Sequence, residues 1–121
     1  MCNRIHKEHE PIKKTGVGWK LFRTNHGHFY PLCKVGRFNA PTKEWVMWDE
    51  EHPNVRNNDA GFCFFLDEQE AEDTHRYWGT NVLRKIAYRR GICRQVENSF
   101  RGGHVLNVAL CKSFKILKKG E

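Results

Sequence analysis

The sequence predicts a single α+β domain over residues 16–117, with a bent, mostly antiparallel sheet of several short strands packed by one main helix at about residues 68–78. Two observations support this fold class. Short segments rich in aromatic and β-branched residues recur between turn signals, which is typical of strands. One segment combines the start signal, periodicity and stop signal of a helix. The chain has no internal repeat, and 121 residues is an ordinary length for one domain.

The two ends are predicted to lie outside this domain. Residues 1–15 are polar and charged, which predicts a flexible leader, and residues 118–121 are expected to be a frayed tail. The leader lacks the apolar core of a signal peptide. The longest apolar run, residues 62–66, is far shorter than the ~20 residues of a membrane-spanning helix. We therefore expect no membrane segment.

The first strands are predicted from residue 16 onward. Residues 16–23 have strand composition and are followed by turn chemistry at 25–27, so a hairpin with residues 28–32 is expected. Residues 45–48 form another short strand, because large and β-branched side chains fit a pleated surface. The acidic stretch 49–61, which contains proline and several asparagines, is predicted to be a long surface loop.

The helix is the element with the most complete local signals. It follows residues 62–66, which are apolar on both faces and therefore predict a buried central strand. Asp67 is the expected N-cap, with Glu70 three residues later, and Gly79 supplies the stop. The stripe expected to dock on the sheet consists of Ala71, His75 and Trp78.

Strand character returns after the helix. Residues 82–90 alternate imperfectly, and Gly91 predicts a bulge or bend before a further strand segment at 92–96. Residues 104–111 and 114–117 are expected to be the closing strands.

Charge is sorted by position along the chain. Residues 1–43 carry nine Lys/Arg against two Asp/Glu, residues 44–73 carry one against ten, and residues 74–121 carry eleven against two. Such blocks imply either neutralisation within the fold or a face of one sign that is offered to a partner. The partner of a basic face would be a polyanion or an acidic protein surface.

The C-terminal basic block supplies the candidate binding residues. Cations that can neutralise phosphates alternate there with rings that can stack on bases. The predicted nucleic-acid or partner site consists of Arg84, Lys85, Tyr88, Arg89, Arg90, Arg94 and Arg101. The alternative is structural: basic residues on edge strands prevent aggregation and could pair with the acidic helix. The sequence alone does not choose between these interpretations.

The cysteines and histidines predict neither a disulfide framework nor a cofactor. Five widely spaced cysteines without a Cys-x-x-Cys motif favour reduced thiols in a cytoplasmic protein. Cys2, His6 and His9 could lie near one another, but zinc requires a fourth ligand from elsewhere. We therefore expect no metal and no cofactor.

Parts of the sequence resemble small uncharacterised proteins encoded by bacteriophages and prophages. The shared order is residues 18–23, a glycine-containing hairpin, residues 61–65, a helix with Glu70 and Ala71, and then residues 82–88 and 105–117. Those proteins have a Gly-Phe-His-x-Phe strand before the helix, and Cys63 replaces their histidine. The resemblance implies a phage protein that binds host machinery in the host cytoplasm, such as a nucleic acid or nucleoprotein, and inhibits a host defence system.

A more distant resemblance, to the ADP-ribosyltransferase-like fold, defines the alternative function. Residues 62–78 are similar to the Gly-x-x-Phe/Tyr-Phe strand and following helix of those enzymes. The resemblance implies that Arg23 or His28 would contact the substrate and that Glu97 would orient the ribose. A cleft in which these residues meet Tyr30 would favour the enzyme, whereas a convex basic face would favour binding. With few acidic candidates in this region, we expect a binding protein and assign no catalytic residue.

Overall fold

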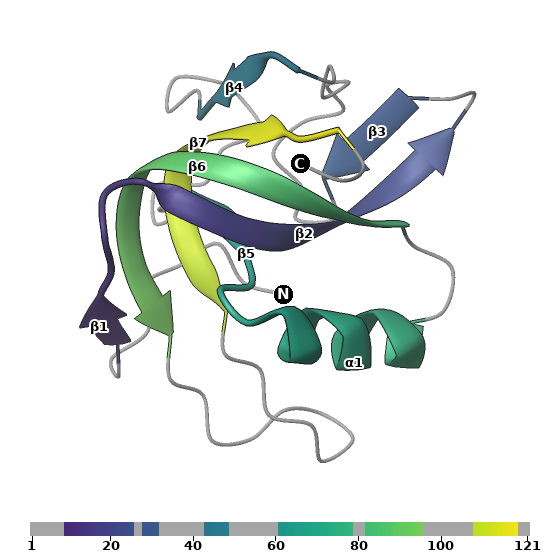
Figure 1. The fold of residues 1–121 in the computed structure, drawn as a ribbon, viewed down its shortest axis with the longest axis horizontal. Coiled ribbons are helices and arrows are strands. Elements are labelled where there is room, and N and C mark those ends of the chain that lie inside the picture. The colour runs from purple at the N-terminus through teal and green to yellow at the C-terminus, as the bar shows by residue number, and fades with distance from the viewer. Residues whose placement is uncertain are drawn as a thin grey trace.

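The computed structural model describes residues 9–25, 28–31, 43–48, 61–78, 82–95 and 108–118. Over these residues the chain forms a seven-stranded sheet, with antiparallel strand pairs, and one helix (Figure 1). The prediction of a mostly antiparallel sheet with one helix is confirmed, and the sheet is the larger part. The elements are β1 (His9–Pro11), β2 (Gly16–Asn25), β3 (His28–Pro31), β4 (Trp45–Met47), β5 (Phe62–Phe64), α1 (Glu68–Trp78), β6 (Val82–Gln95) and β7 (Ala109–Ile116).

The sheet is organised around two central strands, β6 and β7. The strand order is β3-β2-β6-β7-β4, with β1 also paired to β6 and β5 also paired to β7. The sheet curls back on itself. Trp19 of β2 and Phe65, the residue after β5, exchange two backbone hydrogen bonds of 2.8 and 2.7 Å. The segment that contains β5 is therefore joined to β7 on one side and to β2 on the other. The predicted hairpin is confirmed as β2 and β3, which meet at Asn25 and His28.

The bend predicted at Gly91 is present within β6. The register with β7 shifts between Gly91 and Cys93, and Arg90 has a left-handed backbone with φ of 54°. Such a bulge increases the local twist and redirects the strand. As a result, β6 pairs with β2 before the bulge and with β1 after it, and Figure 1 shows its pronounced curve.

The N-terminal segment differs from the predicted leader. Residues 9–11 form β1, with His9 opposite Gln95 and Pro11 opposite Cys93. The backbone N–H of Gly91 also donates to the Lys14 carbonyl oxygen at 3.0 Å. The polar composition of this segment does not predict a strand. The strand is stabilised by its pairing with the end of β6 that follows the bulge. Residues 1–8 lie outside the described part of the chain.

The core has two clusters, one on each face of the sheet. The alternation predicted for residues 62–66 is confirmed, since Phe62 and Phe64 lie in the first cluster and Cys63 and Phe65 in the second. The first cluster is rich in aromatic rings and comprises Phe22, Val46, Trp48, Phe62, Phe64, Ile86, Tyr88, Ala109, Cys111, Phe114 and Ile116. The second includes Ala71 of α1, which is fully buried, so the helix docks on that face.

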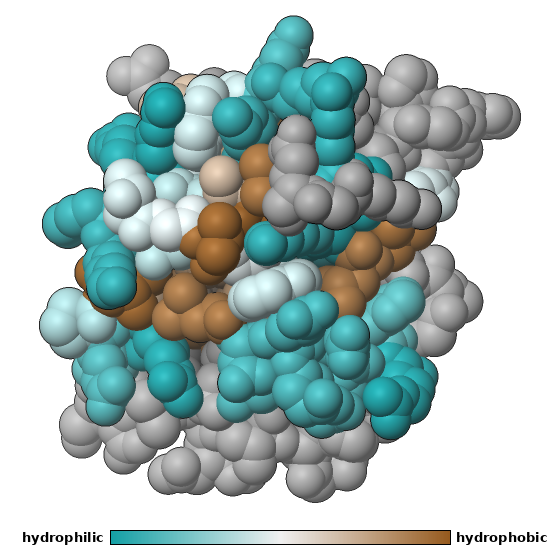
Figure 2. Space-filling model, in the orientation of Figure 1, coloured by the Kyte–Doolittle hydropathy of each residue, from teal (hydrophilic) through white to brown (hydrophobic). Residues whose placement is uncertain are grey.

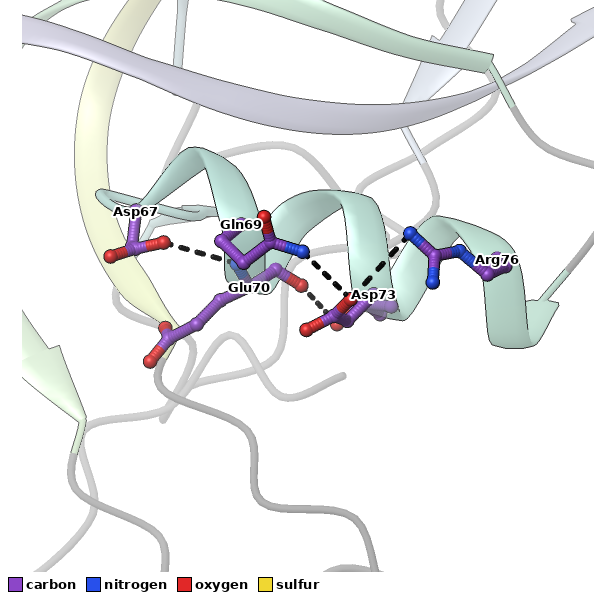
Figure 3. Close-up of polar contacts among 6 residues, drawn as sticks. Asp67, Gln69, Glu70, Asp73 and Arg76 are labelled. Carbon is purple, nitrogen blue, oxygen red and sulfur yellow. Dashed lines mark hydrogen bonds and ion pairs between the residues drawn. The ribbon is translucent and has the colours of Figure 1, made fainter.

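The helix begins where the sequence predicts. The backbone N–H of Glu70 donates to Oδ1 of Asp67 at 3.1 Å, which is the expected N-cap bond (Figure 3). Asp73 accepts a hydrogen bond from Gln69 at 3.0 Å and forms an ion pair with Arg76 at 3.8 Å. Of the predicted docking stripe, Ala71 is buried, His75 is half-buried, and the Trp78 side chain lies outside the described set. No described helix is both long and apolar enough to cross a membrane.

Candidate functional site

The predicted basic cluster is divided between the two faces of β6. Side chains alternate along a strand, so Arg84, Ile86 and Tyr88 point into the core while Lys85 and Arg89 point outward. Tyr88 is only 3% exposed, and its ring centroid lies 4.7 Å from that of Phe64. Burial, and secondarily the nearby Cys111, raises the pKa of Tyr88. Its ring therefore belongs to the core and is not placed to stack on a base.

The remaining arginines of the predicted cluster occupy different environments. Arg84 donates from Nη2 to the carbonyl oxygen of Leu117 at 2.7 Å, so it supports the end of β7. Arg94 lies directly across from Glu10 of β1, where opposite charges favour the pairing of the two strands. Arg90 is exposed at the bulge. Arg101 lies outside the described residues.

The outward side chains of β6 belong to a larger basic and aromatic surface. Strand pairing places Val17, Ala87, Lys115 and Trp45 in one row across β2, β6, β7 and β4. Residues directly opposite each other in neighbouring strands point to the same side. Arg89 and Met47 extend this surface in the next row. We call this surface the Trp45 face and define it by Val17, Trp45, Met47, Lys85, Arg89 and Lys115.

The centre of the Trp45 face is an indole ring flanked by two cations. The Arg89 guanidinium carbon lies 3.8 Å from the Trp45 ring centroid, and the Lys115 ammonium nitrogen lies 5.2 Å from it. Both distances are within the range of cation–π attraction. Arg89 is exposed, and Trp45 and Lys115 are half-buried. The ring therefore holds the two charges at the surface.

Exposed apolar side chains border these charges. Met47 is 56% exposed and Val17 is 49% exposed, and they are the large hydrophobic residues most open to solvent among those described. Figure 2, in the orientation of Figure 1, shows a band of hydrophobic residues between two hydrophilic regions. That band adjoins the helix, whereas β4 lies at the far side of the molecule from α1 (Figure 1).

No described carboxylate neutralises the Trp45 face. Lys85, Arg89 and Lys115 form no ion pair with any residue that the structure describes. The acidic helix pairs Asp73 with its own Arg76. The structural alternative, in which the basic strand neutralises the helix, is therefore not supported for these three residues.

One lysine side chain, that of Lys20, lies in the core. Lys20 is 1% exposed, and its Nζ donates to the Cys63 carbonyl oxygen at 2.7 Å. Burial lowers its pKa to about 8, and burial raises the pKa of Cys111 to about 12. Three rings surround the ammonium, with centroids 5.7 to 5.9 Å from Nζ: Phe22, Phe62 and Phe114. The group is closed to solvent, so it does not offer a binding site.

The described residues do not test the enzyme alternative. Arg23 is exposed on β2, and its backbone lies opposite Tyr30 of β3. The side chains of His28 and Tyr30, and all of Glu97, lie outside the described set. Within the residues described, no three His, Cys, Asp or Glu side chains gather as they would around a metal ion. Cys2 and His6 of the N-terminal metal hypothesis are not among them.

The cysteines differ from the expectation of five reduced thiols. Cys63 is disulfide-bonded, to a cysteine that is not among the described residues, while Cys93 and Cys111 are free and buried. The expectation was wrong for Cys63 because sequence spacing does not reveal which cysteines approach one another when the sheet curls.

Sequence reasoning identified Lys85 and Arg89 but missed their neighbours Trp45, Met47 and Lys115. Each neighbour lies on a strand whose alternation is visible in the sequence, with Val46, Phe114 and Ile116 as the buried partners. The sequence alone does not predict that β4 and β6 both pair with β7, which brings the three strands side by side. Comparisons of the chain with protein-family models, with curated proteins and with solved structures find no match. The resemblance to phage proteins therefore stays a prediction.

Proposed function

We propose that the protein is a binding protein that engages nucleic acid through the Trp45 face. The observation that carries this proposal is the stacking of Arg89 on Trp45, with Lys115 beside the same ring, on a face without a described carboxylate partner. By the resemblance to phage proteins, the nucleic acid or nucleoprotein would belong to the host, and binding would inhibit a host defence system in the host cytoplasm.

The geometry of the arginine supports phosphate recognition. Arg89 is exposed, so its guanidinium, which lies over the indole, can form paired hydrogen bonds to a phosphate from the solvent side. Because the ring already restrains the side chain, less conformational entropy is lost on binding. Lys115 adds a second positive charge next to the same ring.

Removing two positive charges from the Trp45 face tests the proposed nucleic-acid binding. We expect the double variant Arg89→Ala/Lys115→Ala to bind a labelled oligonucleotide more weakly than the wild type. The slope of log K against log salt should fall in magnitude by about two, because each lost phosphate contact releases roughly one fewer counterion. Fluorescence anisotropy across a salt series measures both quantities.

A charge-matched control separates this site from net charge. The variant Arg23→Ala/Arg76→Ala also removes two positive charges, from exposed positions on β2 and α1. We expect it to keep most of the affinity and nearly the same salt slope. Equal losses in the two variants, or no binding by the wild type, would contradict the proposal.

A further inference from the structure

We infer that the Trp45 face selects single-stranded over double-stranded nucleic acid, an inference that rests on the proposed function. Unpaired bases would stack on the Arg89–Trp45 pair and pack on Met47, while Lys115 and Lys85 would contact the phosphates.

The first step of the argument concerns the apolar side chains. Met47 and Val17 are about half exposed and lie in the same two rows as the cations. A duplex presents phosphates and sugars on its outside and keeps the faces of its bases stacked within. Against a duplex these side chains would gain little, whereas a single strand offers base faces that can cover them.

The second step concerns the stacking partner. Arg89 is exposed and lies 3.8 Å over Trp45, so the side of the guanidinium away from the indole can accept a base. Bases of single strands stack on arginine planes as well as on aromatic rings. Met47 follows Trp45 by two residues on β4, at a separation of ~7 Å, so it can contact a neighbouring base.

The third step concerns the shape and charge of the other elements. Reading a duplex commonly requires a helix or ribbon that enters a groove. The one helix in the described part of the chain carries Glu68, Glu70, Glu72 and Asp73, so it would repel phosphates. The residues of the Trp45 face lie on strands, which form a broad surface suited to a splayed strand.

The test compares a single strand of about 15 deoxythymidines with a blunt duplex of the same length, at equal salt. We expect the wild type to bind the single strand at least tenfold more tightly, by fluorescence anisotropy. Equal affinity, or preference for the duplex, would overturn the inference and leave the proposed function standing. Absence of binding to both would overturn the proposed function itself.

Two variants test the stacking role. Arg89→Lys keeps the charge but removes the planar group, and Met47→Ser removes an apolar contact at an exposed position. We expect each to weaken single-strand binding about tenfold, as loss of one stacked base would, and to leave duplex binding unchanged. The matched control Arg76→Lys makes the same change at an exposed position on α1, outside the Trp45 face, and should retain affinity for both ligands. If a variant lost affinity for the single strand and for the duplex by the same factor, the inference would be overturned.

Discussion

Lys20 is a charged residue in the part of the core where aromatic rings are densest. Its ammonium donates a hydrogen bond to the Cys63 carbonyl oxygen and is surrounded by three aromatic rings. A buried charge is costly unless such groups compensate it. Across from it on β6 lies Arg84, also a cation, and Cys111 on β7 is a neutral thiol below its raised pKa of about 12. The compensation is therefore incomplete, which agrees with the lowered pKa of Lys20.

This environment predicts a pH dependence of stability. The unfolded chain has a Lys20 pKa near 10.5 and the folded chain one of about 8, so the folded state binds the proton more weakly. The free-energy cost of burying the charged Lys20 ammonium is therefore full below pH 8, and it disappears as the pH rises to 10.5. We expect the free energy of unfolding of the wild type, relative to that of Lys20→Met, to rise by about 3 kcal/mol over this window. Urea denaturation at several pH values measures the difference.

The comparison with Lys20→Met is needed because the ionisation of Cys111 changes the free energy of unfolding with pH in the opposite direction. Its pKa is about 9 in the unfolded chain and about 12 in the folded one, so its ionisation removes stability between pH 9 and 12. Burial is the main cause of that shift and persists in the variant. Parallel stability profiles for the wild type and Lys20→Met would show that Lys20 does not titrate as expected.

Among the elements, β6 determines the course of the sheet. Gly91 sits at its bulge, close to the N-terminal segment, and an added Cβ would overlap the Lys13 carbonyl oxygen and lie 2.8 Å from the Tyr88 ring. The preceding Arg90 has φ of 54°, a conformation that glycine adopts without cost. Both positions therefore favour glycine, residue 91 because of the limited space and residue 90 because of its backbone conformation.

We expect Gly91→Ala to lower the free energy of unfolding by about 2–3 kcal/mol, because the backbone of residues 13–14 must move away from β6. Arg90→Gly, by contrast, should leave stability unchanged or raise it by up to about 1 kcal/mol. Thermal or chemical denaturation of both variants checks the pair. A Gly91→Ala variant as stable as the wild type would mean that the N-terminal segment is not held against β6.

The helix depends on its N-cap. Asp67→Ala removes the acceptor for the Glu70 N–H and should cost about 1 kcal/mol of stability, whereas Asp67→Asn retains an acceptor and should cost little. Denaturation of the two variants side by side gives the comparison. Equal losses would assign the effect to the charge of Asp67 near the helix dipole and not to the cap bond.

The elements also show which features of this fold can be derived from sequence. The helix, the strand at Phe62–Phe64 and the bulge at Gly91 were predictable, because capping, alternation and glycine act within a few residues. β1 was not, because its three residues are exposed and gain their stability from pairing with β6. The Trp45 face was predicted only in part for the same reason. Lys85 and Arg89 lie in one charged run, but Trp45 and Lys115 join them through strand pairing between distant segments.

At the scale of the whole molecule, the charge blocks of the sequence become separate surfaces. The acidic block contributes α1, which packs on the second core cluster, and the C-terminal basic block contributes the cations of the Trp45 face. α1 packs with Leu21 and Leu83, which lie on the same face of β2 and β6 as Val17 and Lys85, but at the far end of the molecule from β4 (Figure 1). This separation keeps the carboxylates of the helix away from a bound polyanion, as the proposed function requires.

The disulfide of Cys63 bears on the compartment in which the protein works. Disulfides are rare in cytosolic proteins, where thiols are kept reduced, so activity in a host cytoplasm requires a binding face that does not depend on the Cys63 bond. Cys63 belongs to the second core cluster with Ala71 of α1, and it does not contribute to the Trp45 face. Reduction should therefore affect stability and binding differently.

We expect iodoacetamide to leave Cys63 unlabelled in the unfolded, non-reduced protein and to label it after reduction, as peptide mass spectrometry would detect. Cys93 and Cys111 are buried thiols with raised pKa values, so they should react only on unfolding. Reduction should lower the free energy of unfolding by about 2–4 kcal/mol. Oligonucleotide affinity should stay the same while the protein remains folded, because the Trp45 face is formed by β2, β4, β6 and β7 and does not include Cys63. Labelling of Cys63 without reductant would show that the bond is absent in solution, and loss of affinity on reduction would show that the face depends on it.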